Sequence, residues 1–314
     1  MIGLLIIVSA PLQAQEDVEP EPAIMARLAP SSLLLDLALA GDAVVAVGER
    51  GHILVSTDVG QTWQQRPCPT RTMLTGVFFI DGEMGWAVGH DSAILKTSDG
   101  GSTWKLVNWA PEEEAPLFDV WFSDPENGVA IGAYGTHLVT VDGGETWDFE
   151  PIGDLDWHLH KIRPAGGDRL FMAGEAGTVF RSDDGGLTWI ELPSPYEGSF
   201  FGVLPLDEET VLLFGLRGHL FRSEDAGETW QELETDTVAM LTDGLLLGDG
   251  NIVIAGLGGT VLVSQDGGLS FQLHAQGDRR GISAIVEARD GTLIMSGEFG
   301  VRATTLADLM SGSE

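Results

Sequence analysis

Short apolar stretches alternate with glycine-rich turns along most of this chain, in units of about 41 residues. Within a unit, an apolar stretch is followed by a turn, a second stretch that ends at glycine, a tight turn, a third stretch and a last stretch that opens with tryptophan. In the second unit these stretches are residues 74–80, 85–88, 93–97 and 104–108. Runs this short predict β-strands, and nowhere is the apolar spacing of a helix sustained. We therefore expect an all-β protein.

A second feature of each unit is a motif of the form S-x-D-x-G-x-T-W, first seen as S-T-D-V-G-Q-T-W at residues 56–63. Its aspartates return at intervals of 41 to 43 residues. An aspartate can accept bonds from backbone N–H groups of the turn, and the following aromatic ring can pack between neighbouring units. These positions predict a structural repeat made of Asp58, Trp63, Asp99, Trp104, Asp142, Trp147, Asp184, Trp189, Asp225, Trp230, Asp266 and Phe271.

A glycine that ends the second strand marks seven units, the last of which lacks the aspartate motif: Gly48, Gly89, Gly132, Gly174, Gly215, Gly256 and Gly297. Four short strands in about 41 residues is the size of one propeller blade. We predict a seven-bladed β-propeller with four-stranded blades over residues 30–314. The seventh unit lacks its fourth strand, and we expect residues 23–28, within an N-terminal segment of residues 15–29, to supply it and close the ring.

The N-terminus, residues 1–14, reads as a secretory signal peptide, because a short apolar run precedes a polar, acidic sequence. No Lys or Arg precedes the apolar run, which leaves a truncated start or a buried β-strand as alternatives. The single cysteine, Cys68, excludes an intrachain disulfide, and no cysteine follows the apolar run to carry a lipid. We expect an exported protein.

The charge of the chain excludes one class of partner. Lys and Arg total 16 against 48 Asp and Glu, which gives a formal net charge of -32. A field of this sign repels nucleic acid and anionic lipid headgroups and favours solubility. We expect no nucleic-acid partner, no membrane insertion of the mature chain, no cofactor, and a monomer.

Candidate chemistry lies on one face of such a ring, where the turns between second and third strands adjoin the segments that lead into first strands. The aspartate motifs lie on the other face. Arg, His and aromatic residues vary among units on the first face, and they are types enriched at protein interfaces. Solvated loop residues and core aromatics are the alternative interpretation. The candidates for partner binding are Arg50, Arg71, His90, Tyr134, His158, His160, Phe201, Arg217, Arg279 and Arg280.

Two weaker chemical signals remain. His158 and His160 are two residues apart, so an extended strand would point both to one side, where they could hold a metal; no further ligand motif supports this, and we expect no metal. Aligned positions in the first strands form a column, which places mixed charge in the central channel as solvated residues or as acid–base groups. This column is Leu35, Gly76, Asp119, Lys161, Gly202, Asp243 and Ala284.

The repeated motif resembles the Asp-box, or BNR, repeat of sialidases and other secreted propellers. The longer units V-G-E-R-G-H-I-L-V-S-T-D-V-G-Q-T-W at residues 47–63 and A-G-E-A-G-T-V-F-R-S-D-D-G-G-L-T-W at residues 173–189 are more similar to the photosystem II stability and assembly factor family. The resemblance covers about residues 30–305. It implies a seven-bladed propeller that binds a membrane protein during assembly rather than an enzyme, located in the periplasm, or in the thylakoid lumen of a photosynthetic host. A non-photosynthetic bacterial member fits the same repeat.

The competing interpretation is a sialidase-like glycoside hydrolase. That chemistry requires three arginines, a tyrosine nucleophile with a glutamate partner, and an aspartate acid. The chain has two tyrosines, Tyr134 and Tyr196, and R-L-A-P at residues 27–30 resembles the sialidase arginine motif only loosely. Sialidases are also six-bladed. We therefore favour an exported, non-enzymatic propeller that acts as an assembly, stability or accessory factor for a membrane or envelope protein complex.

Overall fold

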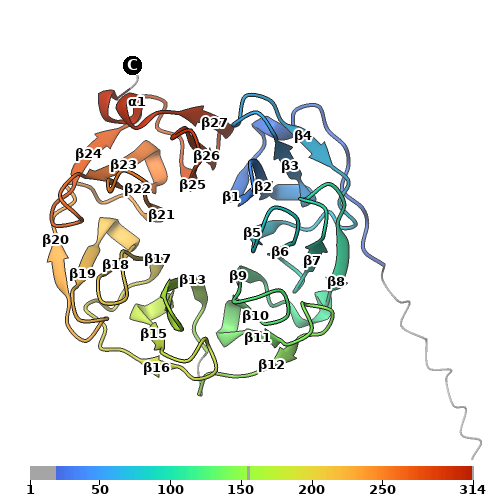
Figure 1. Cartoon of the computed structure of the whole chain (residues 1–314), viewed down its shortest axis with the longest axis horizontal. Coiled ribbons are helices and arrows are strands. Elements are labelled where there is room, and N and C mark those ends of the chain that lie inside the picture. The colour runs from blue at the N-terminus through green and yellow to red at the C-terminus, as the bar shows by residue number, and fades with distance from the viewer. Residues whose placement is uncertain (1–18, 154–155, 313–314) are drawn as a thin grey trace, which may run out of the picture.

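The computed structural model describes residues 19–153 and 156–312, in which seven antiparallel sheets form a ring around a central axis (Figure 1). Six sheets contain four strands and the seventh contains three. Each sheet is one blade, and its strands follow the chain from the axis to the outer edge. The predicted all-β, seven-bladed propeller is confirmed. The predicted signal peptide, residues 1–14, lies outside the described residues.

The first four blades have these bounds. Blade 1 contains β1 (Leu34–Ala40), β2 (Ala43–Gly48), β3 (Ile53–Ser56) and β4 (Gln64–Arg66). Blade 2 contains β5 (Leu74–Phe79), β6 (Gly85–Gly89), β7 (Ile94–Thr97) and β8 (Lys105–Asn108). Blade 3 contains β9 (Leu117–Phe122), β10 (Gly128–Gly132), β11 (His137–Thr140) and β12 (Asp148–Phe149). Blade 4 contains β13 (Leu159–Gly166), β14 (Arg169–Gly174), β15 (Val179–Ser182) and β16 (Ile190–Glu191).

The remaining blades and the helices complete the chain. Blade 5 contains β17 (Phe200–Pro205), β18 (Val211–Gly215), β19 (Leu220–Ser223) and β20 (Gln231–Leu233). Blade 6 contains β21 (Leu241–Leu246), β22 (Ile252–Gly256), β23 (Thr260–Ser264) and β24 (Gln272–Ala275). Blade 7 contains β25 (Ile282–Glu287), β26 (Leu293–Gly297) and β27 (Gly300–Thr304). The 3-10 helices are η1 (Ala29–Ser31), η2 (Glu49–Gly51), η3 (Pro111–Glu113), η4 (Ala133–Gly135), η5 (Glu175–Gly177), η6 (Leu216–Gly218) and η7 (Leu257–Gly259), and α1 is Leu306–Ser311.

The marker glycines allow a close backbone approach. A Cβ atom at Gly48 would collide with the carbonyl oxygen of Leu33, just before the first strand of the same blade. The N–H of Glu49 donates to that same carbonyl at 3.0 Å. The same contact recurs in blade 2, where Gly89 faces the carbonyl of Met73. Glycine is therefore required here by the lack of space for a side chain, because each second strand ends against the chain that enters its own blade.

Each aspartate motif closes on itself by hydrogen bonds. In blade 1, Asp58 accepts the backbone N–H of Thr62 at 2.8 Å and its hydroxyl at 2.6 Å. The hydroxyl of Ser56 donates to the same carboxylate at 2.9 Å. The bonds to Thr62 lower the pKa of Asp58, because they favour its charged form. Gly60 has a φ of +77°, which explains the glycine in the motif.

The motif tryptophans pack between a blade and the one before it. The Trp104 ring lies edge-on to Phe79 of its own blade, with 6.0 Å between ring centroids. It joins the hydrophobic cluster that contains Val45 and Val55 of blade 1. A further tryptophan, Trp86, donates its indole N–H to the carbonyl of Gly143 in the blade 3 motif at 3.1 Å. Successive blades are thus joined by large aromatic surfaces as well as by aliphatic strands.

Blade 7 is completed differently from the prediction. Within the described ranges no fourth strand pairs with β27. Helix α1 follows instead, and Leu309 lies fully buried in the cluster between blades 6 and 7, where the other blades place their motif tryptophan or, in blade 6, Phe271. The side-chain amide of Gln276 donates to the carbonyl of Leu309 at 3.1 Å and fixes the helix against blade 6. The helix therefore takes the place of the aspartate motif and fourth strand.

The prediction that residues 23–28 close the ring as the fourth strand of blade 7 is wrong. This segment runs along the outer edge of blade 1, where the N–H of Ala23 donates to the carbonyl of Cys68 at 3.0 Å. The ring closes instead by direct packing of β1 against β25 and β26, through a cluster that includes Leu37, Ala284 and Ile294. Among the described residues, no helix has the length and apolar character needed to cross a bilayer.

Candidate functional site

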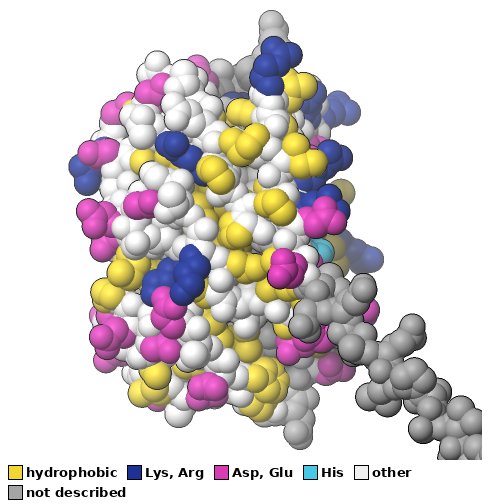
Figure 2. Space-filling view, turned by 90° about the vertical axis from the view of Figure 1, so that its right-hand side faces the viewer, with side chains coloured by type: hydrophobic (Ala, Val, Ile, Leu, Met, Phe, Trp, Pro, Cys, Tyr) yellow, Lys and Arg dark blue, Asp and Glu magenta, His cyan; other side chains and the backbone are white. Residues whose placement is uncertain are grey.

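One face of the ring carries the turns η2, η4, η5, η6 and η7 together with the segments that lead into the first strands; we call it the turn face. Hydrogen bonds show that the two sets adjoin. The N–H of Ala133 donates to the carbonyl of Pro116 within blade 3, and the N–H of Gly135 donates to the carbonyl of Trp157 at 2.9 Å. In an edge view, Lys and Arg side chains gather along the right-hand side of the molecule (Figure 2).

Blades 3, 4 and 5 bring aromatic and imidazole rings together on the turn face, and we call Phe118, Tyr134, His158, His160 and Phe201 the aromatic cluster. Tyr134 lies edge-on to His158 at 5.1 Å between centroids. His160 stacks on Phe201 at 4.7 Å, and Phe118 lies within 6 Å of both histidines. Tyr134 is 58% exposed. The structure thus joins four sequence-predicted candidates, and it adds Phe118, which the sequence shows only as one of several aromatics before a first strand.

Hydrogen bonds fix the two histidines of the cluster. Nδ1 of His158 accepts a hydrogen bond from the backbone N–H of Tyr134 at 3.1 Å. The backbone N–H of His158 donates to the Glu175 carboxylate at 3.2 Å. Nδ1 of His160 lies 2.8 Å from the carbonyl of Phe200 and donates to it. Burial lowers the pKa of His160, so its ring is neutral at neutral pH. In the described ranges, no three His, Cys, Asp or Glu side chains converge as metal ligands.

The arginines are not gathered at this cluster. Arg50 lies in η2 at blade 1 and lines one pocket with Arg71, and Arg217 lies in η6 at blade 5. Arg279 and Arg280 lie in the loop after β24, where the Arg279 N–H donates to the carbonyl of Gln276 at 3.1 Å. These residues are exposed, as is His90 at blade 2. The predicted basic rim is therefore a set of separate sites around the ring.

Several candidates occupy a backbone conformation that is costly for a residue with a side chain. Arg50, Tyr134 and Arg217 have φ values of +58°, +55° and +58° at equivalent positions of their turns. Blade 6 has Gly258 there, whereas blade 4 has Ala176 at +52°. Such positions cost of order 1 kcal/mol and often mark functional sites. Ala176 shows that the turn also tolerates a residue without a recognisable binding role.

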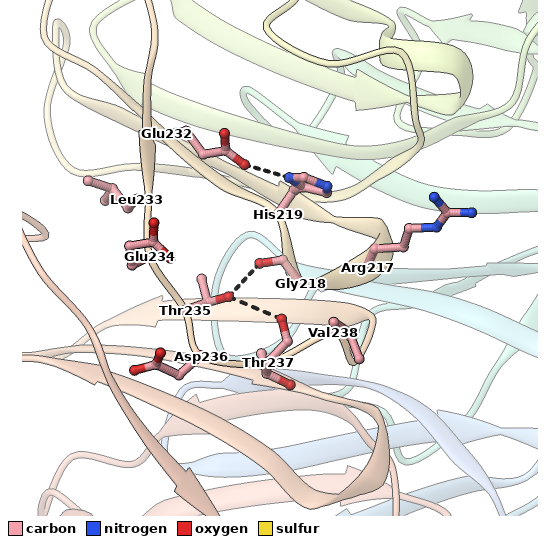
Figure 3. A pocket seen from close by; sticks show the side chains of 10 residues that line it. All are labelled: Arg217, Gly218, His219, Glu232, Leu233, Glu234, Thr235, Asp236, Thr237 and Val238. Atoms are coloured by element: carbon pink, nitrogen blue, oxygen red, sulfur yellow. Dashed lines mark hydrogen bonds and ion pairs between the residues drawn. The ribbon is translucent and has the colours of Figure 1, made fainter.

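Arg217 helps to line a groove formed by blade 5 and the segment that leads from it to blade 6 (Figure 3). Its volume is about 490 Å³. Nδ1 of His219 lies 2.6 Å from the Glu232 carboxylate, and the Thr235 hydroxyl donates to the carbonyl of Gly218 at 2.8 Å. Figure 3 shows the Arg217 side chain extending away from the acidic residues of the opposite wall. These polar groups of the groove form hydrogen bonds with one another, which is typical of a structural contact at the edge of a blade.

The central channel contains a buried charge network that the sequence showed only in part. The prediction of Leu35 for blade 1 is wrong, and Asp36 holds that position. Leu34 pairs with the marker glycine Gly48, as Leu117 pairs with Gly132 in blade 3, and the inward residue lies two positions after this leucine. Asp36 and Asp119 are 5% and 2% exposed, and each accepts a first-strand N–H of the next blade at 2.9 to 3.0 Å. Asp243 does the same towards blade 7. The aspartates therefore join neighbouring blades.

Two cations from blade 4 cross the channel to these carboxylates. Lys161 lies 3.7 Å from Asp36 and 3.9 Å from Asp119. Arg163, which the sequence analysis missed, lies 2.9 Å from Asp119 and 4.0 Å from Asp243. Burial raises the pKa of Asp36 despite the attraction of Lys161. Burial alone would lower the pKa of Arg163, but the surrounding carboxylates raise it. These contacts favour a structural brace over acid–base catalysis or solvated channel residues.

Comparisons with known proteins agree with this geometry. A family model described as photosynthesis system II assembly factor YCF48 matches residues 108–245. Photosystem II assembly lipoprotein Ycf48 of Trichormus variabilis is 38% identical over 129 residues, which cover 40% of this chain and 38% of the relative. The chloroplastic photosystem II stability/assembly factor HCF136 of Cyanidioschyzon merolae is 39% identical over 80 residues, which cover 24% of this chain and 18% of the relative. The resemblance to this family is confirmed.

Solved structures match over nearly the whole ring. A structure of YCF48 bound to D1 peptide superposes with a TM-score of 0.72 at 20% identity and covers 91% of this chain and 97% of that chain. YCF48 from Cyanidioschyzon merolae gives a TM-score of 0.72 at 17% identity, with 87% and 95% covered. At these identities the likeness shows the fold. In sequence, the chain matches less than two fifths of the length of the curated relatives.

Proposed function

We propose that this chain, whose central blades resemble the photosystem II assembly factors, is an exported, non-enzymatic propeller that binds a segment of a membrane or envelope protein complex on its turn face. It acts there as an assembly, stability or accessory factor. The similar proteins carry assembly names, and one solved neighbour is described as bound to a D1 peptide. We extend that role to this chain because its turn face carries exposed aromatic residues that can bind a protein segment.

The aromatic cluster is the observation that carries the proposal. Its rings come from three successive blades, so the surface exists only in the folded ring. Tyr134 is more than half exposed, and Trp157 beside it is 50% exposed. Exposed aromatic side chains on a rigid scaffold are the usual anchors of a protein interface. Neighbouring rings with fixed orientations suit an extended segment with apolar side chains.

Export and the monomeric state belong to the same proposal. Two cyanobacterial relatives are named lipoproteins, which supports an exported protein. The one cysteine of this chain, Cys68, is buried, and burial raises its pKa to about 11. A buried thiol with that pKa remains protonated and unreactive. We place the protein in the periplasm, or in the thylakoid lumen if its host is photosynthetic.

The geometry gives less support to the sialidase-like alternative. Tyr134 packs on a histidine rather than on a glutamate partner, and the carboxylates of the channel bond to backbone N–H groups and to blade 4 cations. Arg27 lies on the exposed N-terminal segment, which runs along the outer edge of blade 1. The catalytic set of a sialidase needs to surround one substrate. These positions favour a binding protein.

The test is affinity capture of the tagged mature protein from its own cell envelope after mild crosslinking. We expect one stoichiometric membrane or envelope complex with the wild-type protein, and roughly tenfold less with Tyr134→Ala, as for loss of an interface anchor. The matched control is Leu187→Ala, because Leu187 is 83% exposed and lies in an aspartate motif on the opposite face. Equal capture by wild type and Tyr134→Ala would remove the aromatic cluster as the binding site.

A further inference from the structure

The N-terminal segment forms a strap, residues 21–28, on the outer edge of blade 1. Besides the Ala23 bond to Cys68, two side chains hold the strap, Gln65 by hydrogen bonds and Arg71 by an ion pair with Glu21. The N–H of Ala26 donates to the Gln65 side-chain oxygen at 2.7 Å, and the Gln65 amide donates to the carbonyl of Ile24 at 3.1 Å. The strap contains no strand or helix, ends in a turn where the N–H of Ala29 donates to the carbonyl of Ala26, and is attached to blade 1 by few bonds.

One side of the strap is an apolar wall. The wall consists of the side chains of Ile24, Ala26 and Leu28, the last of which belongs to the turn that ends the strap. They line a pocket of about 610 Å³. Ile24 is 71% exposed and Leu28 is 65% exposed. The wall thus offers apolar area that nothing in the described part of the chain covers.

The opposite side of the pocket is basic and is formed by Arg50, His52 and Arg71. His52 is buried, and burial lowers its pKa, so its ring is neutral and accepts a bond from the Gln65 amide at 3.0 Å. The two guanidinium groups are therefore the cations of the pocket. Of the two, Arg71 is paired with Glu21 on the strap.

The two arginines differ in how far they are paired. Arg71 lies 2.8 Å from Glu21, so an extended segment already presents a carboxylate to it. Arg50 forms no ion pair with the residues that the structure describes, and its φ of +58° holds its side chain at the pocket at a conformational cost. One guanidinium is thus engaged by the strap itself, and the other is available for a second carboxylate.

We propose that this pocket binds an extended segment of the partner protein that places an aliphatic side chain on the wall of Ile24, Ala26 and Leu28 and a carboxylate on Arg50. The inference rests on the proposed function and assigns a second contact, at blade 1, in addition to the aromatic cluster at blades 3 to 5. The charge of the pocket selects acidic over basic segments, and its apolar wall selects aliphatic over purely polar ones.

A defined probe tests the pocket without knowledge of the partner. The probe is a fluorescein-labelled, acetylated nonapeptide with the core Leu-Thr-Asp between Gly and Ser residues, and the controls replace its Leu by Ser or its Asp by Asn. Fluorescence anisotropy follows binding to the full mature chain. We expect saturable binding below about 1 mM. We also expect roughly tenfold weaker binding of each control peptide.

Protein variants locate the peptide. Leu28→Ser and Arg50→Gly are both expected to weaken binding roughly tenfold, and neither threatens the fold, because Leu28 is exposed and glycine suits the backbone of residue 50. Glu21→Gln frees Arg71 and is expected to strengthen binding two- to threefold. Absence of binding up to about 1 mM, equal binding of all peptides, or equal binding by Leu28→Ser would overturn the inference.

Lipid is the competing occupant. Vesicles of phosphatidylcholine with phosphatidylglycerol that bind the wild type but not Leu28→Ser, together with no peptide binding, would assign the pocket to a membrane surface and overturn the proposal. The proposed function has its own test: it fails if Tyr134→Ala leaves envelope capture unchanged, whatever the peptide result. If capture depends on Tyr134 and the peptide does not bind, the function stands and the pocket inference fails.

Discussion

Arg50, Tyr134 and Arg217 share one backbone position, two residues after a marker glycine, and this position links local strain to the candidate site. The sequence identifies it by counting from the glycine. It does not show that φ is positive there, because Arg, Tyr and Ala all occupy the position and only Gly258 has the residue that the conformation prefers. If these side chains serve binding rather than the fold, replacing them by glycine should raise the stability of the protein, because glycine relieves the strained backbone.

At Arg217, we expect glycine to be more stable than alanine by about 1 kcal/mol, because both remove the side chain and only glycine relieves the left-handed backbone. Urea denaturation of the two variants measures the difference. Ala176→Gly is the matched control and should gain a similar amount, since Ala176 has the same conformation in blade 4. An Arg217→Ala variant as stable as Arg217→Gly would show that the turn is not strained.

Buried histidines make stability depend on pH. Burial lowers the pKa of His137, which is 2% exposed, below its value in the unfolded chain. The unfolded state then binds the proton first, so the stability is fully present above about pH 6.5 and is lost as the pH falls below it. We expect His137→Gln to reduce the loss between about pH 7 and 5, by up to about 1.4 kcal/mol per pH unit.

The control for this pH effect is His90→Gln, because His90 is exposed. Urea denaturation at each pH gives the slope. The motif aspartates titrate in a separate window, since hydrogen bonds from Thr146 lower the pKa of Asp142 to about 2. A slope that is the same in the wild type and in His137→Gln would contradict the account of this histidine.

The residues of the site were predictable where the repeat aligns the units unambiguously and not where the alignment is ambiguous or a contact joins distant blades. Tyr134, His158, His160 and Phe201 were found because residues near the marker glycine and before the first strand share a face. Asp36 was missed because residues 33–35 are three consecutive leucines, so the sequence leaves open which of them starts the strand, and the structure pairs Leu34 with Gly48. Arg163 was missed because its side chain reaches aspartates of other blades, a contact that no local pattern encodes.

At the scale of the elements, blades 1 to 6 follow the repeat and blade 7 does not. Apolar periodicity and turn residues predict the strands because each blade buries the same inward positions. How the ring closes depends on which blade edge the terminal segment contacts. The alternating pattern of residues 23–28 fits the edge of blade 1 as well as that of blade 7. The replacement of a strand by α1 could not be predicted, since residues 306–311 follow the last repeat.

Two variants compare how much the N-terminal strap and the C-terminal helix α1 contribute to stability. Leu309→Ala is expected to destabilise the protein by about 3 kcal/mol, because it opens a cavity between blades 6 and 7. Deletion of residues 21–28 should lower the unfolding midpoint only slightly, because the strap pairs with no strand. Thermal unfolding followed by circular dichroism measures both.

Leu269→Ala is the control for the helix variant, because Leu269 is 58% exposed. It should leave the midpoint unchanged. A larger loss from the strap deletion than from Leu309→Ala would mean that the N-terminal segment, and not α1, completes the ring.

For the whole molecule, the channel network replaces part of the support that a shared closing strand would give. Blade 4 reaches blades 1, 3 and 6 through Lys161 and Arg163, so the ring is joined across its axis as well as around its circumference. The cost of burying these charges is offset by the hydrogen bonds that the aspartates accept from backbone N–H groups.

Removal of one of these carboxylates should therefore destabilise the protein strongly. Asp119→Ala is expected to cost about 3 to 5 kcal/mol, because it leaves Arg163 and the Ile162 N–H without their buried partner. Asp42→Ala serves as the control, because the ion pair of Asp42 with Arg289 is exposed on both sides. Urea denaturation that finds less than about 1 kcal/mol for Asp119→Ala would show that the network does not brace the ring.

The central claim is that the turn face binds a protein of the membrane or envelope, and photo-crosslinking in the cell tests it most directly. A photoreactive amino acid replaces Tyr134 in one strain and Leu187 in another, and the adducts are identified by mass spectrometry. We predict one dominant adduct with a subunit of a membrane or envelope complex from position 134 and none from position 187. No adduct at position 134, or the same adducts from both faces, would contradict the claim.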